Sequence, residues 1–173
     1  SQIGDVSNLI LDPDLDSYYL MDITLLKTAD ELQNIDEVFK FISNKGASKT
    51  LTDREAVRIT VLAGLITSNT EGMNYSFNAA FKNDSTKDKI LKKNLQPYFD
   101  KYRLVSETVT AKLTETAERK KISPEESQIV ADNCAIMKKN LVDLFNKSIQ
   151  KQNALLENRI SKFRTALYSA LSV

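Results

Sequence analysis

The feature that most constrains the fold is a long helical pattern in the last third of the sequence. From Glu125 to Val173 the chain contains no glycine and no proline. Apolar residues recur here at intervals of three and four, a spacing that places side chains on one face of an α-helix. They are Val130, Cys134, Met137, Leu141, Phe145, Ile149, Leu156, Ile160, Phe163 and Leu167. Such a helix is about 70 Å long, roughly twice the length of an ordinary globular helix or more.

The rest of the sequence predicts three further helices. Only four glycines and three prolines occur in 173 residues, which is too few for the many tight turns of a β-sandwich or barrel. The first predicted helix spans about 14–44, the second spans about 52–82, and the third begins near Ser85 or Lys87. The core-facing stripe predicted for the first helix is Leu15, Tyr18, Asp22, Leu25, Ala29, Leu32, Asp36, Phe39 and Ile42, and it is broadened by Tyr19, Leu26, Ile35 and Val38.

Capping residues mark two of the helix starts. Thr52 can cap the second helix while Glu55 reaches back to its backbone amide, and Ser123 with Glu126 repeats this capping box before the last helix. Pro97 falls inside the third predicted helix, where proline removes a backbone hydrogen bond. We therefore expect a kink or a short break at the residue before it.

The connections between these helices are short, near residues 45–51, 83–86 and 120–123. Short connections require consecutive helices to run antiparallel. The sequence therefore predicts a single all-α domain over residues 1–173, an antiparallel up-down-up-down four-helix bundle with long first and last helices. Both ends of the chain then lie at one end of the bundle. The apolar spacing of residues 3–11 is also partly helical, so the first and last helices could leave the bundle together.

The composition argues against most enzymatic chemistry. The chain has no histidine, so it lacks the commonest metal ligand and the commonest general base at neutral pH. Its 24 basic and 23 acidic residues leave a net charge of +1, which disfavours a nucleic-acid partner. We expect no enzymatic activity, no metal and no cofactor. The lone Cys134 fits a buried packing position.

One segment, Val6–Asp22, has an unusual combination of residues, and its sequence is VSNLILDPDLDSYYLMD. It resembles the stretch that follows the first transmembrane helix in a family of bacterial receptors. This family includes methyl-accepting chemotaxis proteins and membrane sensor histidine kinases of two-component systems. The resemblance covers these 17 residues, and beyond them only the general helical pattern is shared.

The resemblance implies a periplasmic helical sensor domain held between two membrane spans of an inner-membrane protein. In the intact receptor a linker such as a HAMP domain and a cytoplasmic output module would follow. The family includes both chemoreceptors and kinases, so the output stays open. The implied partners are a small-molecule ligand, such as an organic acid or amino acid, or a periplasmic binding protein. The intact receptor is expected to be a homodimer, and this chain itself contains no apolar run of membrane-spanning length.

Two roles remain open for the polar residues of the segment. Asp12 and Pro13 can start a helix, because aspartate caps the free amides and proline suits the first turn. Asp14 and Asp16 then favour the positive end of the helix dipole. The alternative is a polar ligand site between helices. Its candidate residues are Asn8, Asp12, Asp14, Asp16, Ser17, Tyr18 and Tyr19.

A second candidate site lies near the start of the second helix. Arg54 and Arg58 are one helical turn apart, so they share a face and could clamp a carboxylate. The alternative is a pair of ordinary surface arginines screened by Asp53 and Glu55. The unusually polar stretch 67–74 is a third candidate, with a weakly packed, solvent-facing helix segment as its alternative.

A different class of function would explain the same features. A freestanding helical adaptor, gripping a partner helix with an exposed apolar stripe, also needs helices and no chemistry. The discriminating feature is the flanking gene sequence. A receptor fragment requires apolar spans of about 20 residues on both sides, and an adaptor does not.

Overall fold

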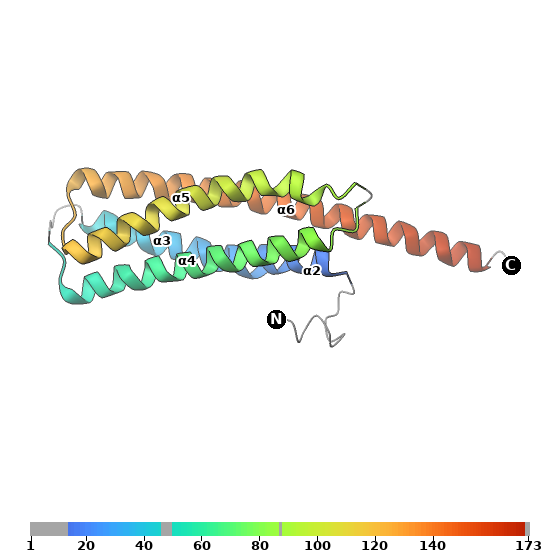
Figure 1. Cartoon of the computed structure of the whole chain (residues 1–173), viewed down its shortest axis with the longest axis horizontal. Coiled ribbons are helices and arrows are strands. Elements are labelled where there is room, and N and C mark those ends of the chain that lie inside the picture. Colours follow the sequence, from blue (N-terminus) through green and yellow to red (C-terminus); the bar gives the residue numbers. More distant parts are fainter. Residues whose placement is uncertain (1–13, 46–49, 87, 172–173) are drawn as a thin grey trace.

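A computed structural model describes residues 14–45, 50–86 and 88–171 of the chain. These residues form an antiparallel four-helix bundle, as predicted (Figure 1). No β-strand occurs in these three ranges. The first helix of the bundle consists of α2 (Leu15–Met21), the π-helix η1 (Asp22–Lys27) and α3 (Thr28–Lys45). The other three are α4 (Asp53–Lys82), α5 (Leu91–Arg119) and α6 (Pro124–Leu171).

Both predicted capping boxes are confirmed. The Glu55 amide donates to the Thr52 hydroxyl at 3.3 Å, and the Thr52 amide donates to the Glu55 carboxylate at 2.9 Å. At the start of α6, the Glu126 amide donates to the Ser123 hydroxyl at 3.1 Å, and the Ser123 amide donates back to the Glu126 carboxylate at 2.9 Å. These starts were predictable because every group involved lies within four residues.

The predicted start of the third helix is wrong, since α5 begins at Leu91. The buried carboxylate of Asp84 holds the preceding segment in a turn. It accepts hydrogen bonds from the Thr86 amide at 2.9 Å and from the Leu91 amide at 2.8 Å. Pro97 therefore lies in the second turn of α5, and the helix continues through it without the expected break.

The stripe predicted for the first helix is only partly correct. Ile35, Val38 and Ile42 are buried as predicted, whereas Leu25, Leu26 and Phe39 are 61%, 62% and 44% exposed. In η1 the hydrogen bonds reach back five residues, so a turn holds more residues and the following face is rotated. The polar residues Thr24, Thr28 and Glu31 become core positions, which a search for apolar periodicity passes over.

The core of the bundle combines aliphatic layers with an aromatic cluster. Phe77 of α4 packs on Phe99 of α5 with ring centroids 5.2 Å apart, and Tyr102 follows Phe99 at 6.4 Å. Cys134 is buried, as predicted, and burial raises the pKa of its thiol to about 12. The thiol is therefore a packing group and not a nucleophile at neutral pH.

The last helix is the long one. It has 48 residues, against 30 in α4 and 29 in α5, and its final part extends beyond the bundle (Figure 1). The three described parts of the first helix, with 7, 6 and 18 residues, together have 31 residues, so this helix is about as long as α4 and much shorter than α6. The projecting part of α6 exposes large apolar side chains. They are Ile160, Phe163, Leu167, Tyr168 and Leu171.

Residues 1–13, which were expected to accompany α6, lie outside the described residues. In the described part of the chain, no helix combines the length and the apolar character needed to cross a membrane.

Candidate functional site

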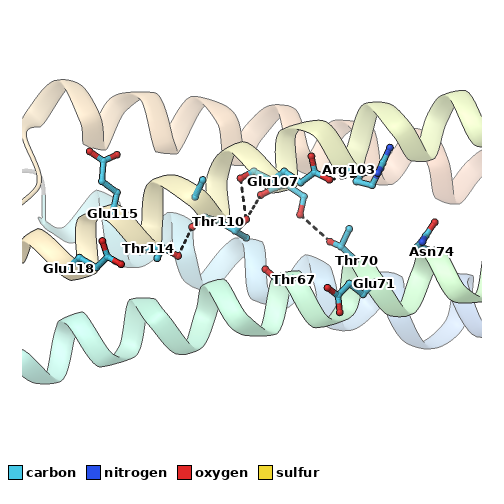
Figure 2. A pocket seen from close by; sticks show the side chains of 12 residues that line it. Thr67, Thr70, Glu71, Asn74, Arg103, Glu107, Thr110, Thr114, Glu115 and Glu118 are labelled. Carbon is cyan, nitrogen blue, oxygen red and sulfur yellow. Dashed lines mark hydrogen bonds and ion pairs between the residues drawn. The ribbon is translucent and has the colours of Figure 1, made fainter.

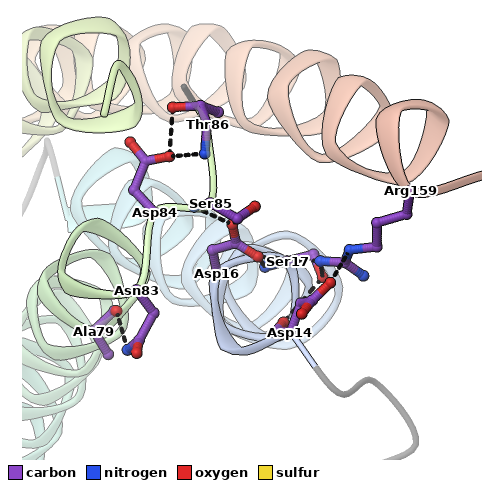
Figure 3. A network of polar contacts seen from close by, with 9 residues as sticks. All are labelled: Asp14, Asp16, Ser17, Ala79, Asn83, Asp84, Ser85, Thr86 and Arg159. Carbon is purple, nitrogen blue, oxygen red and sulfur yellow. Dashed lines mark hydrogen bonds and ion pairs between the residues drawn. The ribbon is translucent and has the colours of Figure 1, made fainter. Parts of the chain in front are cut away.

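The first and last helices are joined by a buried ion pair. We call this group the helix junction, and it comprises Asp14, Asp16, Ser17, Ser85 and Arg159. The Asp16 side chain is fully buried, and its carboxylate accepts from the Arg159 guanidinium at 3.1 Å. Arg159 also donates to the Ser17 hydroxyl at 2.6 Å and pairs through Nε with Asp14 (Figure 3).

The junction brings together three segments that are distant in the sequence. The second oxygen of Asp16 accepts from the amide of Ser85 at 2.9 Å and from its hydroxyl at 2.6 Å. Asp16 thereby connects the start of α2 with the segment between α4 and α5 and, through Arg159, with α6 at the point where it leaves the bundle (Figures 1 and 3). A buried carboxylate requires such partners, because an uncompensated charge in the interior is strongly destabilising.

The candidate residues of the receptor-like segment have different environments in the structure. Tyr19 is buried, with its ring edge-on to Tyr18 at 5.2 Å and to Tyr75 of α4 at 6.0 Å. Both tyrosines therefore take part in packing, next to the junction. Asn8 and Asp12, the other two candidates from this segment, lie outside the described residues.

A second polar group lies in the core between α3, α4 and α5. We call it the buried polar layer, and it comprises Glu31, Asn69, Thr70, Tyr102 and Ser106. Glu31 is fully buried and accepts hydrogen bonds from the Tyr102 hydroxyl and, at 3.0 Å, from the Asn69 amide. Burial raises the pKa of Glu31, and these hydrogen bonds oppose the rise. The layer continues from Tyr102 to Thr70 at 3.2 Å and from Thr70 to Ser106 at 3.0 Å.

The outer end of this layer opens into a groove of about 720 Å³ between α4 and α5 (Figure 2). Thr70 and Ser106 belong both to the layer and to the groove wall. The lining of this α4–α5 groove is rich in hydroxyl and carboxylate groups. It consists of Thr67, Thr70, Glu71, Asn74, Arg103, Ser106, Glu107, Thr110, Ala111, Thr114, Glu115 and Glu118.

The polar stretch 67–74 of α4 was predicted to be either a ligand site or a weakly packed, solvent-facing segment. Neither description fits the whole stretch. Thr70 is buried and hydrogen-bonded, whereas Thr67, Glu71 and Asn74 are exposed in the groove. The segment is helical along its whole length. Its polar residues are divided between the core layer and the groove wall.

The two predicted arginines belong to the first turns of α4, and α4 begins at the end of the bundle away from α2 (Figure 1). Arg54 and Arg58 line one groove of about 770 Å³ together with Lys40 of α3, which the sequence did not single out. Arg58 lies 3.8 Å from the Glu37 carboxylate and 5.8 Å from the centre of the Phe41 ring. The lining also includes the Glu55 carboxylate, so the three basic side chains of this basic groove are partly balanced, as the alternative interpretation expects. The structure does not join the groove to the aspartates of the receptor-like segment.

Arg159 is the residue of the junction that the sequence did not reveal. It lies 143 residues from Asp16 in the chain, inside an amphipathic helix where arginine is ordinary. The predicted topology was the one indication of this contact. In a bundle with both chain ends on one side, the start of the first helix lies beside the place where the last helix leaves the bundle. In the described ranges no cluster of three or more carboxylate or cysteine groups is arranged to hold a metal ion.

Comparisons with protein-family models, with curated protein sequences and with solved structures find no match to this chain.

Proposed function

We propose that this chain is the extracytoplasmic sensor domain of a bacterial transmembrane receptor, a chemoreceptor or a sensor histidine kinase. The helix junction is the observation that supports the proposal most directly. A domain inserted between two membrane spans must have the start of its first helix and the end of its last helix on the same side. Here Asp16 and Arg159 join those two helices at the side from which α6 projects.

The junction also suggests how a signal would be transmitted. Arg159 makes three contacts with the first helix, to Asp14, Asp16 and Ser17. Small helix displacements switch packed bundles between discrete arrangements. A sliding movement of α6 along α2 would exchange these contacts for another set. A stimulus that favours one set would thereby change the relative position of the two helices at the membrane.

The basic groove is the proposed place for a direct acidic stimulus. Lys40, Arg54 and Arg58 can pair with the carboxylates of an organic acid or amino acid. The lining of this groove comes from the last part of α3 and the start of α4, which lie at the end of the bundle away from α2 and the exit of α6 (Figure 1). A periplasmic binding protein docking on this end is the other form of stimulus that the receptor proposal includes.

The proposal is tested in a chimeric receptor in which this chain replaces the sensor domain of a histidine kinase with a fluorescent reporter output. Arg159→Gln is expected to shift the unstimulated output, because it removes the ion pair between the two helices. Arg164→Gln is the matched control, since Arg164 is an exposed arginine on the projecting part of the same helix. Equal outputs for the wild type and both variants would contradict the proposed transmission route.

The exposed apolar side chains of α6 favour a second candidate function, a helical adaptor. Ile160, Phe163 and Leu167 are 53%, 72% and 48% exposed, and their spacing suits the groove of a partner helix. The sequence of the reading frame around this chain separates the two candidates. Apolar spans of about 20 residues on both sides support the receptor, and their absence supports the adaptor.

A further inference from the structure

We propose that the α4–α5 groove binds an elongated organic cation with ammonium groups at both ends, of the linear polyamine class. The inference concerns a different surface from the basic groove, and binding here does not require the chain to be a receptor. It rests on the shape of the groove, on the charge of its wall, and on the direction of the hydrogen bonds that its hydroxyl groups already make.

The hydrogen-bond chain of the buried polar layer has a fixed direction. Tyr102 donates its only hydroxyl proton to Glu31, so it must accept in its 3.2 Å contact with Thr70. Thr70 therefore donates to Tyr102, and its 3.0 Å contact with Ser106 requires Ser106 to donate. The outermost member of the chain, Ser106, has no proton left and offers only lone pairs to the groove.

Two threonines of the groove wall are committed in the same way. The Thr110 hydroxyl donates to the backbone carbonyl of Ser106 at 3.0 Å, and the Thr114 hydroxyl donates to the backbone carbonyl of Thr110 at 3.0 Å. A hydroxyl has one proton, so these groups can act only as acceptors toward a ligand. The hydroxyls of Ser106, Thr110 and Thr114 therefore form a row of acceptors along α5.

The charged groups of the wall add to this polarity. The lining includes four carboxylates and the guanidinium of Arg103, which lies 3.3 Å from Asp100 and 3.8 Å from Glu107. Glu115 is paired with Lys112 at 3.0 Å and with Arg119 at 3.5 Å, so the negative excess of the wall comes mainly from Glu71 and Glu118. A wall of acceptors with an excess of negative charge recognises a ligand that is both cationic and a hydrogen-bond donor, which describes an ammonium group.

The distribution of these groups determines the shape of the ligand. The α5 wall from Arg103 to Glu118 is about 22 Å long at the helical rise per residue. Glu71 and Glu107 lie toward one end of the groove and Glu118 lies at the other (Figure 2). Between them, Ala111 and the carbon atoms of the threonines provide apolar surface for methylene spacers. An extended chain with cationic ends fits this arrangement, whereas a compact monocation would use only one end.

The groove is also connected to the first helix. Its wall residues Thr70 and Ser106 continue through Tyr102 to Glu31 of α3. The neighbouring Asn69 donates both to Glu31 at 3.0 Å and to the backbone carbonyl of Lys27, the last residue of η1, at 2.8 Å. An ammonium group that donates a hydrogen bond to the Ser106 hydroxyl would therefore bind at one end of a series of hydrogen bonds whose other end lies beside the π-helix.

Isothermal titration calorimetry of the folded chain with spermine and with spermidine tests the inference. We expect saturable binding that weakens as salt is raised, and no binding of dodecanedioate, a dicarboxylate of similar length. Glu71→Gln and Glu118→Gln are each expected to weaken binding about three- to tenfold. Glu157→Gln removes the same charge from an exposed position of α6 outside the groove and should leave the affinity within about twofold.

The acceptor row is tested separately with Thr110→Val, which keeps the side-chain shape and removes the oxygen. It should also weaken polyamine binding, and circular dichroism checks that the helices are retained. Several results would overturn the inference: no binding at millimolar polyamine, binding that survives the combined Glu71→Gln and Glu118→Gln changes, or displacement by magnesium at equal ionic strength. None of these results bears on the chimeric-receptor experiment, so the two proposals fail independently.

Discussion

The hydrogen bond from Tyr102 to Glu31 gives the sharpest stability prediction. Both side chains are fully buried, so water cannot replace the hydroxyl that Tyr102→Phe removes. Glu31 would keep the side chains of Asn69 and Asn34 as hydrogen-bond partners and lose the Tyr102 hydroxyl. A hydrogen bond to a charged group contributes about 1.5–3 kcal/mol. Because no solvent compensates here, we expect Tyr102→Phe to lower the free energy of unfolding by about 2–3 kcal/mol.

The same change in a Glu31→Gln background isolates the role of the charge. With a neutral acceptor, the Tyr102 hydrogen bond returns to the ordinary contribution of about 1 kcal/mol. The double-mutant cycle should therefore show a coupling energy of about 1–2 kcal/mol. Urea unfolding followed by circular dichroism measures all four proteins, provided that their m-values agree. An equal effect of Tyr102→Phe in both backgrounds would refute the reasoning.

The pH dependence of the free energy of unfolding provides a second test of the role of Glu31. Burial raises the pKa of Glu31 in the folded state above its ordinary value of 4.5. A carboxyl with a raised folded pKa contributes stability that is fully present below the unfolded pKa and is lost as pH rises through the folded pKa. Relative to Glu31→Gln, the wild type should therefore gain stability as the pH falls from neutral toward 4.5. The opposite trend would mean that the hydrogen bonds outweigh burial at Glu31.

Three further predictions concern the junction, the cysteine and the cap of α6. Arg159→Gln should lower the free energy of unfolding by about 2 kcal/mol in urea titrations, less than the roughly 3–5 kcal/mol for a fully buried pair because the side chain is 23% exposed; exposed Arg164→Gln should change it by less than about 0.5 kcal/mol. Cys134, whose pKa is raised to about 12 by burial, should react with a thiol reagent only after unfolding. The Ser123 backbone amide, followed by two basic side chains of α5, lowers the pKa of Glu126 to about 2. The resulting stability is present above pH 4.5 and lost as pH falls toward 2, so an acid titration of Glu126→Gln should show a flatter stability curve than the wild type.

Local signals in the sequence predicted the fold well. The capping boxes at Thr52 and Ser123 and the glycine-free run after Pro124 each involve residues close together in the chain. The start of α5 was not predictable in this way. It depends on Asp84, whose carboxylate reaches the Leu91 amide across seven residues, beyond any helical or turn spacing. Apolar periodicity alone extended the helix too far toward α4.

The candidate sites were predicted less completely than the fold. The spacing of Arg54 and Arg58 placed them on one face, and they do line one groove, but Lys40 joins them from a different helix. The apolar pattern does not reveal the π-helix, and near it the core positions include the polar Thr24 and Thr28 while Leu25 and Leu26 are exposed. The α4–α5 groove depends on which threonine protons are already used, and only hydrogen-bond geometry reveals that.

The first helix is held in the bundle at three levels by polar contacts. Asp16 pairs with Arg159 of α6, Asp22 accepts from Ser76 of α4 at 2.6 Å, and Glu31 accepts from Tyr102 of α5. The carboxylates of Asp16 and Glu31 are buried, and the Asp22 side chain is 19% exposed. A buried carboxylate needs a particular donor, so positions of the helix that leave it without one are costly. Together with the close packing of the core, the contacts of Asp16 and Glu31 favour discrete positions of the first helix over continuous drift, and this is the property that a helix-displacement signal requires.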